Sequence, residues 1–422
     1  MSSVLPAGAD VGPGAGPEPG SAGPDPDYAA ALARVVEQVV APAAAEVDRD
    51  GAYPGAAVGA LAAAGLLGLM SAPEAGGRGQ PLAAGAHVIE SLARACGSTA
   101  MVVLMHYAAT AVIEAYGPPA VRRAIAAGNH VSTLAFSEAG SRSHFWAPLS
   151  TATAGPAADD GAAGEGGADE GAVRLDARKS WVTSAGQADS YVWSSRPLAA
   201  PGPMTLWLVP ADAAGLAVQG PFDGLGLRGN ASSPVSGDGV QVPRGAMLGA
   251  DGAGLDIALQ AVLPTFLVLN AAFSLGVMEA LMDEAHGHLA RTRLDHLGVT
   301  LAEQPAARAS YARLRIRTDG VRTFLTDTLT ALATGREDAM LRVLEVKAVA
   351  AEAASEVADG VMRLCGGAAF RKELGVERRF RDSLAARVMA PTTDALLDFV
   401  GRASFGQPLL DAPGAAREEV AR

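Results

Sequence analysis

Residues 360–401 read GVMRLCGGAAFRKELGVERRFRDSLAARVMAPTTDALLDFVG, and this stretch decides the expected fold. It predicts a helix, a turn at Gly366 and Gly367, a basic segment at 377–382, and a new helix that begins after Pro391. Glycines without a Cβ let a ligand approach the backbone closely, and the free N–H groups of a helix start favour an anion. An ordinary corner between two helices has the same pattern, so the stretch alone leaves both interpretations open.

Composition narrows the class of protein. A chain of 422 residues, 49% hydrophobic and 18% charged, is expected to form two or three globular domains. A net charge of −12 argues against a nucleic-acid partner, because phosphate binding needs clustered Lys and Arg. Cys96 and Cys365 lack a CxxC spacing, so we expect neither a disulfide framework nor a metal site, and a cytoplasmic location fits. Residues 257–278 are uncharged, but Pro264 interrupts them, so a buried helix is expected rather than a membrane span.

Helical and strand-like patterns divide the chain into blocks. Apolar residues recur at helical spacing in the first and last blocks, whereas short β-rich runs separated by turn residues fill the middle. The sequence therefore predicts an α+β fold with helical domains on either side of a small antiparallel barrel or sandwich. The expected segments are a disordered leader (1–27), an N-terminal helical domain (28–131), a β-barrel domain (132–247) with an acidic Gly/Ala-rich insertion near 153–171, a C-terminal four-helix bundle (248–405) and a tail (406–422).

Two runs in the middle block carry side chains suited to a cofactor. The run LAFSEAGSRSH at 134–144 leaves an expected strand and turns, which exposes N–H groups and hydroxyls that could hold a pyrophosphate or a flavin edge. The run KSWVTSA at 179–185 places Trp181 and Thr183 on a half-buried strand. A plain strand-to-loop exit and a core tryptophan are the alternatives.

Taken together, these runs resemble the acyl-CoA dehydrogenase family in their order and approximate separation. The resemblance spans roughly residues 28–404, and it implies the family's layout of helical, β and helical domains. The matching runs are 71–79 (family P-E-x-x-G-G-x-G), 134–144 (T-E-P-x-x-G-S-D), 179–185 (K-x-W-I-T-N-G), 293–304 (R-x-x-F-G-x-P-x-x-x-x-Q) and 366–382 (a glycine pair followed by E-R-x-x-R-D).

The resemblance implies that the chain binds FAD without a covalent bond. The tryptophan would flank the isoalloxazine, and the glycine pair and the 293–304 motif would serve the FAD of a neighbouring subunit, so a dimer or tetramer is implied. Arg293 could instead pair with Asp295 or Glu303 on a surface. The residues implied to contact FAD are Leu134, Phe136, Ser137, Ser143, Trp181, Thr183, Arg293, Gln304, Gly366, Gly367, Thr392 and Asp394.

The family's catalytic carboxylate is absent from this sequence. Dehydrogenation of a thioester needs a base near the α-carbon while hydride passes to the flavin. The position that matches the family's glutamate is Ala390, and the position that other members use falls near Phe266. His106 is the first candidate for a substitute base and Asp394 the second. A lone His on an apolar helix is also common in a packed core.

The expected function is oxidation of an acyl thioester, bound to CoA or to a carrier protein, by α,β-dehydrogenation. An electron-transfer flavoprotein or oxygen would take the electrons. Two alternatives remain open: a flavin-dependent monooxygenase on the same fold, which needs no α-proton base and therefore suits Ala390, and a flavin-binding assembly protein without catalysis.

Overall fold

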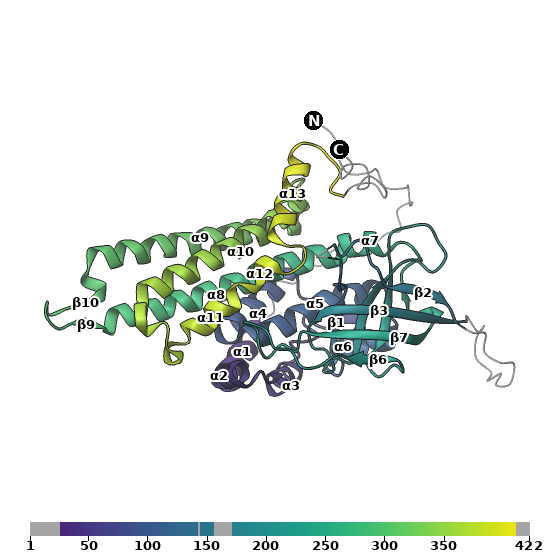
Figure 1. Cartoon of the computed structure of the whole chain (residues 1–422), viewed down its shortest axis with the longest axis horizontal. Coiled ribbons are helices and arrows are strands. Elements are labelled where there is room, and N and C mark those ends of the chain that lie inside the picture. Colours follow the sequence, from purple (N-terminus) through teal and green to yellow (C-terminus); the bar gives the residue numbers. More distant parts are fainter. Residues whose placement is uncertain (1–25, 142–143, 156–170, 411–422) are drawn as a thin grey trace.

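The computed structural model describes residues 26–141, 144–155 and 171–410, and these fold into three blocks in the expected order (Figure 1). Helices occupy the first block, strands the second and long helices the third. The predicted leader, apart from its last residues, most of the acidic insertion, and the end of the predicted tail lie outside the described residues.

The N-terminal block is all-helical, as predicted. Helix α5 is buried over most of its length, because its apolar residues surround the whole axis rather than one face. The helices are α1 (Pro26–Val35), α2 (Ala41–Asp50), α3 (Gly55–Ala63), α4 (Leu82–Ala95), α5 (Gly97–Tyr116) and α6 (Pro119–Ala126).

The middle block forms two four-stranded sheets, with strand orders β1-β4-β5-β8 and β2-β3-β7-β6. All pairs are antiparallel except β1 with β4, which run parallel because the chain crosses to the other sheet between them. Both sheets contribute to one buried core that includes Trp193, Trp207 and Val240. The strands are β1 (Ser132–Ala135), β2 (Thr151–Ala154), β3 (Ala172–Val182), β4 (Ser190–Ser195), β5 (Thr205–Pro210), β6 (Leu216–Val218), β7 (Ser233–Pro243) and β8 (Met247–Leu248).

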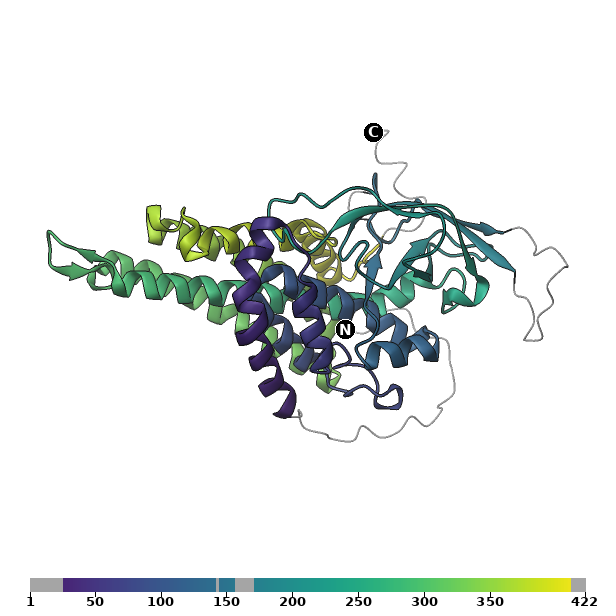
Figure 2. The same cartoon turned by 90° about the horizontal axis from the view of Figure 1, so that it is seen from below.

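Three long helices dominate the C-terminal block and pack side by side (Figure 1). At the far end of α8 and α9, a short hairpin projects away from the strands, and Figure 2 shows the same separation from below. The elements are α7 (Gly254–Ile257), α8 (Leu263–Arg291), the hairpin β9 (Arg293–Leu294) and β10 (Val299–Thr300), α9 (Pro305–Thr334), α10 (Ala339–Cys365), α11 (Val376–Ser383), α12 (Ala385–Val388) and α13 (Thr393–Ser404).

Helix α8 is the buried centre of the molecule. A Cβ at Gly276 would lie 2.3 Å from the carbonyl oxygen of Glu90, so only glycine lets α4 pack this closely on α8.

Two helical stretches of the described chain, 97–116 and 254–291, are apolar and long enough to cross a membrane. Each is 83% buried inside the protein over its most apolar part, which is the behaviour of a core helix and matches the expectation for 257–278.

Helix α11, which lies within residues 360–401, connects the three blocks. Its Arg381 pairs with Asp48 of α2 at 2.6 Å, and the carboxylate of Asp382 accepts a hydrogen bond from the backbone N–H of Leu227 at 2.6 Å. A Cβ at Gly226 would lie 2.5 Å from the carbonyl oxygen of Arg381, so the chain needs glycine there. These contacts fix the loop before β7 against the C-terminal helices.

Candidate active site

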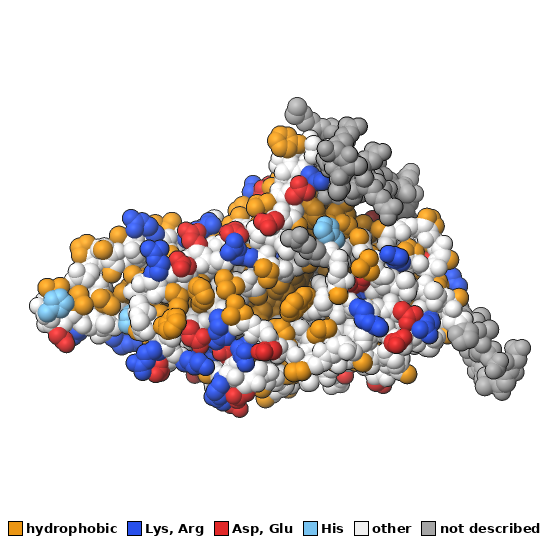
Figure 3. Space-filling model, viewed as in Figure 1, with side chains coloured by type: hydrophobic (Ala, Val, Ile, Leu, Met, Phe, Trp, Pro, Cys, Tyr) orange, Lys and Arg blue, Asp and Glu red, His pale blue; other side chains and the backbone are white. Residues whose placement is uncertain are grey.

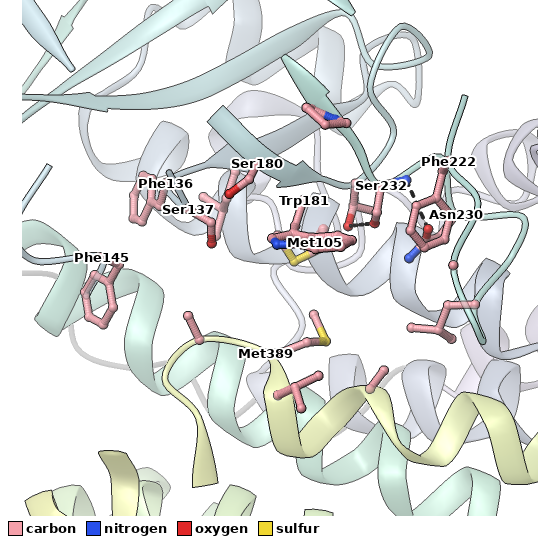
Figure 4. A pocket seen from close by; sticks show the side chains of 18 of the residues that line it. Met105, Phe136, Ser137, Phe145, Ser180, Trp181, Phe222, Asn230, Ser232 and Met389 are labelled. Atoms are coloured by element: carbon pink, nitrogen blue, oxygen red, sulfur yellow. Dashed lines mark hydrogen bonds between the residues drawn. The ribbon is translucent and has the colours of Figure 1, made fainter. Parts of the chain in front are cut away.

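A cavity of about 1020 Å³ lies where the strands meet the C-terminal helices. Its walls come from α5, the exit of β1, the end of β3, the loop before β7, the start of α8 and the segment from α11 to Pro391. Figure 3 shows a hollow in this region surrounded by hydrophobic side chains, and Figure 4 shows it from close by. The wall is mainly apolar, with hydroxyl and amide groups on the strand side.

Five of the residues that were predicted to contact FAD line this cavity. Leu134, Phe136 and Ser137 come from the exit of β1, and Trp181 and Thr183 from the end of β3. In Figure 4 the side chain of Trp181 lies on the strand side, across the cavity from Met389. Ser143 lies outside the described residues. Residues from both runs therefore line the same cavity, and their contact with FAD stays a prediction.

Trp181 and Thr183 have the properties of a surface for a flat aromatic ligand. Trp181 is 69% exposed although it lies in a cavity, and its φ of 55° turns the backbone so that the indole leaves the strand. Thr183 is buried, with its Oγ1 3.0 Å from Ser232 Oγ, so hydroxyl groups lie beside the indole. An isoalloxazine ring has apolar faces and polar edges. An exposed indole face with neighbouring hydroxyls fits such a ring.

A buried ion pair holds the strand side of the cavity in place. Glu138 follows the exit of β1 and Lys179 lies on β3, with 2.5 Å between the carboxylate and the ammonium. Glu138 also accepts from the hydroxyl of Ser150 at 2.5 Å, and Lys179 donates to the carbonyl of Ser194 at 2.7 Å. The ammonium beside Glu138 lowers the pKa of that carboxyl against the opposing effect of burial, so it stays ionised and bound. Glu138 is thus a structural group and not a free base.

Sequence analysis missed the loop from Phe222 to Pro234, which forms another wall of the cavity. Asn230 and Ser232 contribute polar side chains there, and Asn230 accepts from the backbone N–H of Ser232 at 3.1 Å (Figure 4). The signal was present in the run GPFDGLGLRGN, where glycines lie between two strands. Burial raises the pKa of Asp382, which holds this loop, to about 6.

The helix side of the cavity contains the positions where the family's base was expected. Ala390 and Phe266 both line it, together with Met389 and Pro391. Of the described lining residues, the acidic ones are Glu138, which is bound to Lys179, and Asp223, whose side chain is 90% exposed to solvent. Ala390 and Phe266, the positions where a glutamate was expected, therefore line the cavity, but their side chains are apolar.

His106 is buried and is not part of the described cavity wall. Its Nδ1 accepts a hydrogen bond from the backbone N–H of Ser132 at 3.2 Å, so Nε2 carries the proton and faces the carbonyl oxygen of Leu67 at 3.3 Å. Burial lowers its pKa to about 4. Both ring nitrogens are thus used to join α5 to its neighbours, which favours a structural role. Its assignment as the base stays a prediction without support from this geometry.

The environment of His106 predicts a loss of stability in mild acid. Because its pKa is about 4 when folded and about 6.5 in an unfolded chain, the unfolded state takes up a proton first as the pH falls. His106 should therefore lower the free energy of unfolding by about 2 kcal/mol between pH 7 and about pH 5. Urea unfolding of the wild type and of His106→Gln at both pH values measures this. Equal losses in the two proteins would assign the acid sensitivity to other groups.

The remaining predicted residues are not part of the described lining of this cavity. Arg293 is on the projecting hairpin and donates to the carbonyl of Gly298 at 2.6 Å, and it forms no ion pair with a carboxylate of the described residues. Thr392 caps α13 by accepting from the N–H of Ala395 at 3.4 Å. Those outside the lining are Arg293, Gln304, Gly366, Gly367, Thr392 and Asp394.

Comparison with known proteins agrees with the arrangement of the fold. A first helical block, two small sheets and a second helical block around such a cavity define one class of flavoprotein scaffold. Residues 27–128 match the acyl-CoA dehydrogenase N-terminal domain, and residues 252–405 match the acyl-CoA dehydrogenase C-terminal domain. The chain belongs to the acyl-CoA dehydrogenase family. FAD is the cofactor of this family, and its members are oxidoreductases that act on acyl thioesters.

Individual relatives cover most of the chain at low identity. The human mitochondrial short-chain specific acyl-CoA dehydrogenase is 25% identical over 366 residues, which are 85% of this chain and 84% of that protein. An L-prolyl-[peptidyl-carrier protein] dehydrogenase from Pseudomonas fluorescens is 27% identical over 235 residues, 55% of this chain and 61% of its own. The structure of butyryl-CoA dehydrogenase from Megasphaera elsdenii superposes with a TM-score of 0.81 and 20% identity, covering 90% of this chain and 97% of that one.

Proposed function

We propose that this protein oxidises an acyl thioester by α,β-dehydrogenation, with FAD as its cofactor. The observation that carries the proposal is that the 134–144 and 179–185 runs, which resemble the family's cofactor motifs, line one apolar cavity. Bound FAD would accept hydride from the β-carbon of the thioester. Trp181 would give the isoalloxazine ring an aromatic surface to pack on. The apolar wall that includes Phe266, Met389 and Pro391 would hold the acyl chain and exclude water.

The carrier of the acyl group is CoA or a carrier protein. The human relative acts on acyl-CoA by its name, and the Pseudomonas relative acts on a prolyl group on a peptidyl carrier protein. We favour CoA, because the match to the human relative covers 85% of this chain and the match to the Pseudomonas relative covers 55%. Electrons would pass to an electron-transfer flavoprotein or to oxygen. A cytoplasmic location and a role in fatty acid metabolism complete this proposal.

A flavin-dependent monooxygenase is the second candidate function. The observation that favours it is the apolar surface at Ala390 and Phe266, because oxygen activation by a reduced flavin needs no base for an α-proton. The same cavity would then take an apolar substrate that is hydroxylated rather than dehydrogenated. Oxygen consumption after chemical reduction of the flavin, with no reduction by any thioester, would select this function.

We also propose that the protein is a homo-oligomer, a dimer or a tetramer. Arg293 and Gln304 on the projecting hairpin, and Gly366 and Gly367 after α10, match family positions at the cofactor but lie away from the cavity of their own chain. A neighbouring copy would bring them to its FAD. Of these four residues, Arg293 carries a positive charge, and a guanidinium can bind a pyrophosphate through two hydrogen bonds.

The proposed function predicts a yellow protein whose flavin is bleached by its substrate. Purified protein should release FAD, and not FMN, on heating. Anaerobic mixing with acyl-CoAs of increasing chain length should reduce the flavin, and Trp181→Ala should weaken FAD retention because it removes about 1 kcal/mol or more of aromatic contact. Trp207→Phe, in the core of the sheets, serves as the matched control. A colourless protein that reconstitutes with neither flavin would refute the proposal.

A further inference from the structure

Lys347 on α10 lies directly behind the helix-side wall of the cavity. Its Nζ donates hydrogen bonds to the carbonyl oxygens of Met389 at 2.8 Å and Pro391 at 2.6 Å, the two residues on either side of Ala390. The side chain is fully buried, and no described carboxylate forms an ion pair with it. Within the described part of the chain, this buried lysine hydrogen-bonds to two carbonyl groups at a wall that lines the site, and such an arrangement calls for an explanation.

The charge of Lys347 is close to the surface of the cavity. Two of the three N–H groups of the ammonium are used by the carbonyls, and the ring of Phe266 lies with its centroid 6.0 Å from Nζ. Met389, Pro391 and Phe266 all line the cavity themselves. Burial alone lowers the pKa of Lys347 to about 7, so the side chain carries its charge in mildly acidic solution.

We propose that Lys347 is a positioning residue which fixes the wall at Ala390 and makes this wall a binding surface for negative charge at the acyl end of the ligand. The inference rests on the proposed function, because it takes the ligand to be an acyl thioester. The ligand class is a thioester that carries an oxygen anion near its reacting carbons. Two sources have this chemistry: the enolate of a 3-oxoacyl thioester, and the carboxylate of a dicarboxylic acyl group.

A thiol placed on the wall tests the charge without any ligand. Ala390→Cys is combined with wild-type Lys347, with Lys347→Arg and with Lys347→Met, and alkylation at position 390 is followed by mass spectrometry at one mildly acidic pH. A nearby cation lowers a thiol pKa, so the lysine and arginine forms should react about tenfold faster than the methionine form. The native Cys96 and Cys365 are buried and report that each variant has folded.

Ligand binding tests the second part of the proposal. The affinities of butyryl-CoA, acetoacetyl-CoA and succinyl-CoA are measured for the flavin-loaded protein and for Lys347→Met and Lys347→Arg, without turnover. The ratio of the affinity for the anionic acyl groups to the affinity for butyryl-CoA, whose acyl group is uncharged, should fall about tenfold in Lys347→Met and be retained in Lys347→Arg. If Lys347→Met loses affinity for acetoacetyl-CoA, the anion recognised at the wall is the enolate. If it loses affinity for succinyl-CoA, the anion is the carboxylate.

The two parts of the proposal are the positive charge at the wall and the binding of an anionic acyl group, and each can be refuted separately. Equal alkylation rates in the three backgrounds would overturn the charge at the wall, whatever the ligands do. Faster alkylation with an unchanged preference for anions would overturn the binding role of Lys347. If none of the three thioesters binds any form, the proposed function fails and the binding role fails with it, whereas the alkylation rates still establish or refute the charge.

Discussion

Ala390→Glu is expected to raise the rate of flavin reduction by a saturated acyl-CoA by about 10²–10⁴-fold. Ala390 lines the cavity together with Phe266, and the sequence resemblance matches its position to the family's catalytic glutamate. A carboxylate there could take the α-proton, a step for which the described helix-side lining around Ala390 supplies no carboxylate. The nearby Lys347 would keep the introduced carboxyl ionised and ready to accept that proton.

The control for this experiment is Ala390→Gln, which has the same length and polarity but no basic group. Both variants must retain flavin before the anaerobic stopped-flow measurement. Reduction that is equally fast with glutamine and glutamate would mean that volume or polarity, and not proton transfer, changed the rate. Wild-type reduction as fast as that of the glutamate variant would show that the native site already has a base.

Lys179→Met should be the most destabilising single change at the site, by about 3–5 kcal/mol. It leaves the carboxylate of Glu138 buried without its cation, and it also removes the donor to Ser194. The loop between β1 and β2, which carries Phe145 into the cavity, depends on Glu138 through the backbone N–H groups of Leu149 and Ser150. Chemical denaturation followed by circular dichroism measures the loss.

Strand β3 provides a matched control on its exposed side. Arg174 pairs with Asp176 at 2.8 Å, but both side chains are partly in water, so Arg174→Met should leave the unfolding midpoint nearly unchanged. The double variant Lys179→Met/Glu138→Leu should recover part of the stability, because no charge then remains buried. Similar midpoints for Lys179→Met and Arg174→Met would show that the pair is hydrated rather than buried.

Local patterns predicted the architecture, and the resemblance to the family was needed to place two of the runs at one site. The helical blocks follow from apolar spacing, and the exit of β1 and the end of β3 each combine strand-forming residues with a turn, so Ser137 and Trp181 could be placed from their neighbours in sequence. The parallel pairing of β1 with β4 could not be predicted from local patterns, because contacts between residues far apart in the chain decide which strands pair.

Lys347 is the group on the helix side of the site that sequence analysis did not identify. In sequence it lies within the amphipathic pattern of α10, where a lysine normally faces water. Its burial arises only after α8 and the segment before α13 have packed around it, which no local window contains. His106 illustrates the opposite case. The sequence offered a catalytic and a core interpretation, and its two backbone hydrogen bonds became visible only with the fold.

The contacts of α11 also set the order in which the molecule can be completed during synthesis. Arg381 and its partner Asp48 are 333 residues apart, and Asp382 holds a loop 155 residues upstream. The N-terminal block, the described strands and helices α7 to α10 therefore leave the ribosome before the segment that closes the cavity. Until then the nascent chain exposes the apolar faces of that cavity, and chaperone binding at this stage would protect it from aggregation.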